Sequence, residues 1–131
     1  MDESKTIDYW IEIAEYDLQV AESMLEKKHY LYVGFMCHQS IEKILKAHYV
    51  KLKKEVPPPI HKLVRLMKEC KLEDILSEEQ KILLADLDPL NIQARYPAYK
   101  QAIYDFLSEE KAKEILRKTK EIWRWLRTKL S

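Results

Sequence analysis

The chain has 131 residues, of which 47% are hydrophobic and 34% charged, with a formal net charge of +1. This balance suits one globular domain, excludes a disordered chain or a membrane protein, and argues against a surface coated in basic residues, although a local basic patch remains possible. The single glycine disfavours an all-β fold, whose tight turns need glycine.

The first half of the chain predicts two long helices. Apolar residues from Ile7 to Leu25 recur at alternating spacings of four and three, which places them in one stripe of an amphipathic helix. The second helix follows a break at residues 27–29 and ends near Lys54, because prolines occupy 57–59. Gly34 lies inside it at a cost of roughly 1 kcal/mol relative to alanine, so close approach of another helix is expected there. A second apolar row on the first helix predicts a second contact surface, made of Tyr9, Ile13, Tyr16, Val20 and Met24.

The second half predicts two shorter helices and a third long one. One short helix covers about residues 60–70, and another begins at Ser77, where Ser-x-x-Gln forms a capping box. Residues 88–97 are expected to be loop, with a short helical stretch from Tyr99 to Phe106, and Ser108 caps the last long helix. The predicted fold is therefore all-α: an up-and-down, four-helix-bundle-like domain of three long and two shorter helices, spanning residues 1–131.

Polar residues gather in one cluster on the second helix. His38, Glu42 and Lys46 are spaced by four and share one face, with Gln39 and Lys43 beside them. This pattern fits a structural ladder, in which His38 bonds to Glu42 and Lys46 completes the set. A ligand site is the alternative, because buried polar groups need partners.

Two further polar clusters follow in the chain. His61 stands near a helix start with Lys62 and Arg65 close by, and it could cap the turn, touch the neighbouring helix or contact a phosphate. Arg95 and Tyr96, followed by proline, could anchor a loop through a salt bridge or present a guanidinium and a ring to a nucleotide.

Several absences narrow the function. No Walker loop, HExxH motif or nucleophile elbow occurs. Cys37 and Cys70 have no CxxC spacing, so we expect buried apolar side chains in a reducing compartment, with no metal and no cofactor. The N-terminus lacks a signal-peptide pattern and no apolar stretch is long enough for a membrane span, so the expected location is the cytoplasm, away from membranes.

Four motifs together resemble the HEPN family in order and spacing. They are W-x-x-x-A-x-x-D-L-x-x-A in Trp10–Ala21, H-Q-x-x-E-K-x-L-K-A in His38–Ala47, H-x-L-x-x-L in His61–Leu66 and A-R-Y-P in Ala94–Pro97. The second motif followed by the fourth is the most specific part of the resemblance, which spans nearly the whole chain.

The resemblance implies a small helical bundle, often a homodimer, that binds nucleotides or RNA. Small members are frequently encoded beside a minimal nucleotidyltransferase in a toxin–antitoxin-like module, so such an enzyme is the implied partner. Many relatives are metal-independent ribonucleases with an arginine followed, four to six residues later, by a histidine. In this chain every histidine precedes every arginine, so that motif is absent and no catalytic residue is assigned.

We therefore expect a nucleotide- or RNA-binding protein. In the expected site Lys43, Lys46 and Arg95 contact phosphate and Tyr96 stacks on a base. Hydrogen bonds come from His38, Gln39 and Glu42. The expected ligand-binding residues are His38, Gln39, Glu42, Lys43, Lys46, His61, Arg95 and Tyr96.

Two alternatives stand beside this hypothesis. The first is a metal-independent ribonuclease in which His38 or His61 meets Arg95 in space, since general acid–base catalysis needs proximity rather than sequence order. The second is a pure protein-interaction module that uses the second apolar row of the first helix and Trp125.

Overall fold

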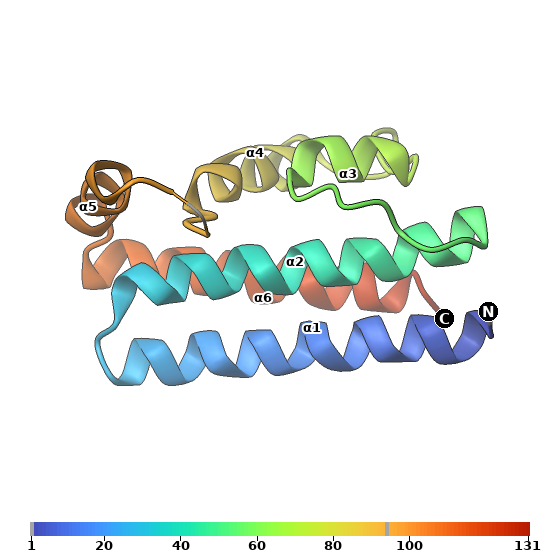
Figure 1. The fold of residues 1–131 in the computed structure, drawn as a ribbon, viewed down its shortest axis with the longest axis horizontal. Helices are drawn as coiled ribbons and strands as arrows, with labels where there is room; N and C mark the ends of the chain where they lie inside the picture. Colours follow the sequence, from blue (N-terminus) through green and yellow to red (C-terminus); the bar gives the residue numbers. More distant parts are fainter. Residues whose placement is uncertain (1, 94) are drawn as a thin grey trace.

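Three long helices form the frame of the molecule. The computed structural model describes residues 2–93 and 95–131, and every regular element in these residues is helical. Helices α1 (Glu3–Glu26), α2 (Tyr30–Lys53) and α6 (Glu109–Thr128) run side by side (Figure 1), and α2 packs against both of the others. The predicted all-α bundle is confirmed.

Shorter elements cover the side of α2 that faces away from α1 (Figure 1). They are α3 (Leu63–Glu69), α4 (Glu78–Leu87), the 3-10 turn η1 (Asp88–Leu90) and α5 (Pro97–Phe106). The described residues thus hold the two predicted shorter helices and α5, which extends the predicted stretch of Tyr99–Phe106 back to Pro97. Residues 88–90, expected as loop, form a helical turn. Proline explains both differences: Pro89 and Pro97 stand in the first turn of their helices, where a fixed φ favours helix and the missing N–H costs nothing.

The predicted helix ends are confirmed by their caps. The Ser77 hydroxyl accepts a hydrogen bond from the Gln80 backbone N–H at 3.1 Å, and the Gln80 side chain accepts one from the Ser77 N–H at 2.9 Å. The Ser108 hydroxyl accepts from the Lys111 N–H at 3.2 Å. Lys54 ends α2 in the left-handed region, with φ of 57°.

The core lies where the apolar stripes of the three long helices meet. Helix α2 contributes most of it and is buried along nearly its whole length after residue 37. The main contacts are made by Ile11, Ala14, Leu18 and Ala21 of α1, by Ile41, Ile44 and Leu45 of α2, and by Leu116, Ile122 and Leu126 of α6.

Small residues within this core fit tightly. A Cβ atom added to Gly34 would lie 2.9 Å from Leu107 Cδ1 and 3.2 Å from Leu90 Cδ1, so the close neighbours are two leucine side chains and not another long helix.

Cys37 and Cys70 are buried free thiols, and burial raises the pKa of each to about 12. Both cysteines are therefore neutral packing residues, as predicted.

The outer side of α1 keeps its second apolar row partly open. Tyr9 and Tyr16 are 55% and 67% exposed, whereas Ile13, Val20 and Met24 are half-buried. Across residues 2–93 and 95–131, no helix has the length and apolarity that a membrane span requires.

His48 makes the stability of the bundle depend on pH. Its Nε2 donates a hydrogen bond to the Leu126 carbonyl oxygen at 2.8 Å, which joins α2 to α6, and burial lowers its pKa. The unfolded chain therefore takes up this proton at higher pH than the folded chain. This contribution to stability is full above the ordinary pKa of about 6.5 and declines as the pH falls below it.

Urea unfolding of the wild type and of His48→Gln, at about pH 7.5 and about pH 5, measures this effect. The glutamine amide can still donate to Leu126 but does not titrate. We expect the wild type to lose more free energy of unfolding on acidification than the variant. Equal losses in the two proteins would contradict the assignment to His48.

Candidate functional site

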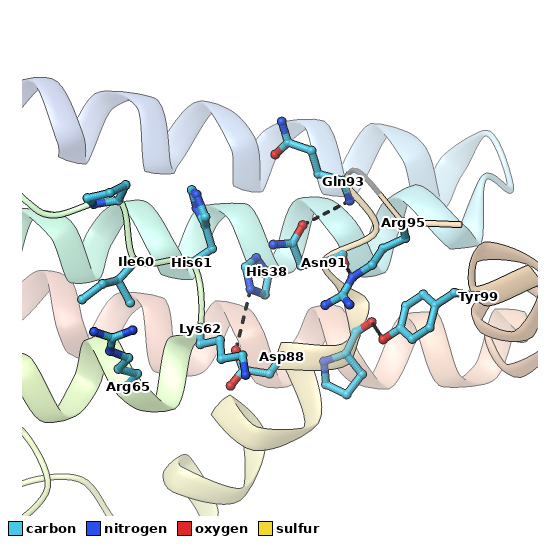
Figure 2. Close-up of a pocket in the computed structure, with 12 residues that line it drawn as sticks. His38, Ile60, His61, Lys62, Arg65, Asp88, Asn91, Gln93, Arg95 and Tyr99 are labelled. Carbon is cyan, nitrogen blue, oxygen red and sulfur yellow. Dashed lines mark hydrogen bonds and ion pairs between the residues drawn. The ribbon is translucent and has the colours of Figure 1, made fainter. Parts of the chain in front are cut away.

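An open groove of about 570 Å³ lies where α2, the segment before α3, η1 and the start of α5 come together (Figure 2). The segment that joins α2 to α3 runs back over α2 (Figure 1), and residues of this segment and of η1 line the groove. The charged and imidazole side chains that line it are His38, His61, Lys62, Arg65, Asp88 and Arg95.

His38 forms the floor of this groove and is fully buried. Its Nδ1 lies 3.9 Å from Glu42 Oε1, and its Nε2 lies 3.8 Å from Asp88 Oδ1. Both distances exceed a hydrogen bond, so neither ring nitrogen has a partner within the described part of the chain. A buried imidazole between two carboxylates, with both nitrogens unpaired, is a costly arrangement that a bound polar group would relieve.

Glu42 connects the buried ladder to the groove. This buried carboxylate accepts a hydrogen bond from Lys46 Nζ at 3.0 Å, and the same oxygen lies 3.1 Å from His61 Nδ1. The His61 side chain remains 57% exposed. Glu42 therefore orients His61 while leaving the other face of its ring open to the groove.

Asp88 caps α3 in place of His61. Its carboxylate accepts hydrogen bonds from the Leu63 N–H at 2.6 Å and the Val64 N–H at 3.4 Å. Of the roles considered for His61, the structure confirms contact with a neighbouring helix, through Glu42 of α2. His61 does not cap α3. The sequence analysis missed Asp88, because it placed residues 88–97 in a loop, and the N–H group of Leu63 that Asp88 caps lies 25 residues away in the chain.

Three exposed cations line the groove. Within residues 2–93 and 95–131, Lys62, Arg65 and Arg95 make no ion pair. Arg95 Nε donates to the Asn91 carbonyl at 3.2 Å, and its guanidinium lies 4.8 Å from the centre of the Tyr99 ring. A backbone oxygen and a ring hold Arg95 in place without neutralising its charge.

Tyr99 is the aromatic side chain of the groove, and the sequence analysis missed it as a site residue. Its hydroxyl donates to the Pro89 carbonyl at 2.6 Å, which fixes α5 against η1 (Figure 2). Tyr96, which was expected to stack on a base, is 85% exposed and does not line the groove.

Other expected residues also lie apart from the groove. Lys43 forms an ion pair with Asp17 of α1, and Gln39 stands four residues earlier on the same face of α2. Lys46 is buried behind Glu42, with its Nζ 5.5 Å from the centre of the Trp10 ring. Ala94, the first residue of the fourth motif, lies outside the described residues.

The groove thus brings together three of the eight expected side chains: His38, His61 and Arg95. Glu42 and Lys46 stand directly behind them, while Gln39, Lys43 and Tyr96 do not line it. In the described ranges, no group of three or more His, Cys, Asp or Glu is placed to hold a metal ion. The ionisable side chains that line the groove are those of three basic residues, two histidines and Asp88.

The comparison with protein families identifies this class of bundle. The model of the HEPN domain matches residues 7–129, so the chain belongs to the HEPN family. The resemblance inferred from the four motifs is confirmed. No curated protein matches the chain.

Two solved structures share the fold. The crystal structure of TT1696 from Thermus thermophilus has 22% sequence identity and a TM-score of 0.78, covering 94% of this chain and 97% of that one. The crystal structure of ST0689, an archaeal HEPN homologue, has 20% identity and a TM-score of 0.69, covering 95% and 98%. At these identities the likeness establishes the fold alone.

Proposed function

We propose that the groove binds the phosphate groups of a nucleotide or of RNA. The observation that carries this proposal is the gathering of Lys62, Arg65 and Arg95 around one groove, with no ion pair to a carboxylate in the described residues. Guanidinium and ammonium groups in this state suit phosphate oxygens, and arginine can bind them through two parallel hydrogen bonds. Membership of the HEPN family, with its implied nucleotide or RNA binding, points the same way.

The two histidines would supply hydrogen bonds to the same ligand. His38 offers its unpaired nitrogens at the floor, and His61 offers the ring edge that faces away from Glu42. The one carboxylate that lines the groove, Asp88, repels phosphate only weakly because two backbone N–H groups already stabilise its charge. The groove as a whole therefore favours an anion.

Direct binding tests this function. We would purify the protein free of nucleic acid and measure binding of labelled ATP and of a short single-stranded RNA, with and without EDTA, while following RNA length in the same sample. Saturable binding that EDTA leaves unchanged is expected. An absence of binding to either probe would contradict the proposal.

A second candidate function is a metal-independent ribonuclease. It is favoured by one observation: an exposed His61, oriented by Glu42 at 3.1 Å, lines the same groove as Arg95. A histidine so held could move the proton of a ribose hydroxyl while the guanidinium stabilises the phosphorane. Cleavage in EDTA that disappears in His61→Ala but persists in the exposed control His29→Ala would support this function.

We also propose that the protein works in the cytoplasm as a homodimer, beside a minimal nucleotidyltransferase in a toxin–antitoxin-like module. The exposed Tyr9 and Tyr16 on α1 support a contact surface. A pure interaction module would use the same surface with Trp125. Sedimentation equilibrium distinguishes the homodimer from the pure interaction module. A wild-type dimer that is lost in Tyr9→Ala/Tyr16→Ala supports self-association, whereas a monomeric wild type supports a different partner.

A further inference from the structure

Helix α5 carries an exposed row of two aromatic rings and a cation. In the described structure this helix has no buried residue, unlike every other helix of the bundle. Tyr96, which precedes the helix, Lys100 and Tyr104 recur every four residues and therefore lie along one face. The two rings are 85% and 62% exposed, and Lys100 is exposed between them.

This row begins where the phosphate groove ends. Figure 2 shows Arg95 and Tyr99 at the α5 end of the groove, Arg65 toward the opposite end and Lys62 between them. Tyr96 follows Arg95 directly in the chain, so the exposed row starts one residue beyond a cation of the groove. The nearest acidic side chain of the helix, Asp105, already accepts a hydrogen bond from Gln101 at 2.9 Å.

We infer that the groove and α5 together form a track for a single-stranded oligonucleotide, and that the ligand class is an oligonucleotide rather than a free nucleotide. This inference rests on the proposed function. Alternating rings and cations match the alternating bases and phosphates of a single strand, whose unpaired bases can stack on aromatic side chains. A duplex keeps its bases stacked inside and could not use the tyrosines.

The order of the track follows from the placement of its parts. Phosphates occupy the groove at Arg65, Lys62 and Arg95, and the strand continues over α5, where bases stack on Tyr96 and Tyr104. Lys100 contacts the phosphate between these two bases. The rings are open on the surface, so their removal affects binding without disturbing the core.

Fluorescence anisotropy with labelled ATP and with RNA of two, four and eight nucleotides tests this inference. In the wild type, we expect the eight-nucleotide RNA to bind at least about tenfold more tightly than ATP. Tyr96→Ala/Tyr104→Ala should raise the Kd of that RNA about tenfold or more while leaving the Kd of ATP unchanged. Tyr32→Ala is the control, because Tyr32 is 50% exposed on α2, does not line the groove and belongs neither to α5 nor to the exposed row of α1. It should alter neither value.

Salt titration separates stacking from charge. Lys100→Gln should reduce the slope of log Kd against log salt for the RNA by about 0.7, whereas the tyrosine variant should keep the wild-type slope. Each variant is checked by thermal unfolding, where no change is expected for these exposed positions.

The outcomes distinguish this inference from the function on which it rests. If ATP and the longest RNA bind equally well, or if the tyrosine variant binds that RNA normally, the track is wrong while the groove stands. If neither probe binds, the groove itself fails. If the tyrosine variant instead changes the molecular mass in solution, the row is an interface between copies of the chain and the track is wrong.

Discussion

Replacing Glu42 by alanine is expected to lower the free energy of unfolding by about 3–5 kcal/mol. Glu42 is 3% exposed and serves Lys46 at 3.0 Å and His61 at 3.1 Å through one oxygen. Its removal leaves the buried ammonium of Lys46 without a counter-charge. Breaking one half of a buried ion pair is costly for this reason, even where the intact pair contributes little.

Urea unfolding of the variant measures the loss, with Glu114→Ala as the control. Glu114 also pairs with basic neighbours, Arg117 and Lys118, but on the exposed side of α6, where water screens the charges and little change is expected. The double variant Glu42→Leu/Lys46→Met removes both charges and should recover much of the lost stability. A small effect of Glu42→Ala would show that Lys46 finds water or another partner.

The fold could be predicted because its signals are local. Helix periodicity depends on residues three and four apart, and caps such as Ser77 and Ser108 depend on neighbours within one turn. The weakest prediction concerned α5, where the helix begins at Pro97 rather than Tyr99. Because α5 has no fully buried residue, no apolar stripe marked its full extent.

The site could be predicted only where one helix carries it. The spacing of His38, Glu42 and Lys46 placed them on one face of α2, and the structure keeps them together. Asp88 reaches this ladder from η1, and no local pattern reveals that its carboxylate lies 3.8 Å from His38. Contacts between distant segments depend on how the elements pack, which spacing alone does not determine.

The sequence analysis predicted Tyr96 in the groove, where the structure has Tyr99, for a similar reason. Tyr99 lies inside α5, where a turn of about 100° per residue sets the direction of its side chain, whereas Tyr96 is the N-cap residue, with an extended backbone that does not follow this helical phase. Residues 88–97 were predicted as loop, and a loop has no helical phase from which side-chain directions could be inferred. Tyr96 was therefore chosen as the stacking ring because it is adjacent to Arg95 in the sequence. The helix instead places the Tyr99 ring against the guanidinium of Arg95, while Tyr96 stands exposed ahead of the helix.

The double variant Arg65→Ala/Arg95→Ala is expected to weaken ATP binding by about 100-fold or more. A hydrogen bond from a charged donor contributes about 1.5–3 kcal/mol, so each arginine alone should account for at least about tenfold. Both side chains are exposed and make no ion pair in the described chain, so their loss should leave the unfolding curve unchanged. Isothermal titration of the wild type, both single variants and the double variant measures the effect.

Arg124→Ala is the matched control, because Arg124 is also exposed but lies on α6, away from the groove. Arg95→Lys keeps the charge and loses the planar contact with Tyr99, so an intermediate affinity is expected if the guanidinium acts through its geometry. The salt dependence of RNA binding gives a separate measure. Removing two phosphate contacts should reduce the slope of log Kd against log salt by about 1.4. An unchanged slope with unchanged affinity would place the phosphates somewhere other than this groove, since binding to a distant basic surface would be indifferent to Arg65 and Arg95.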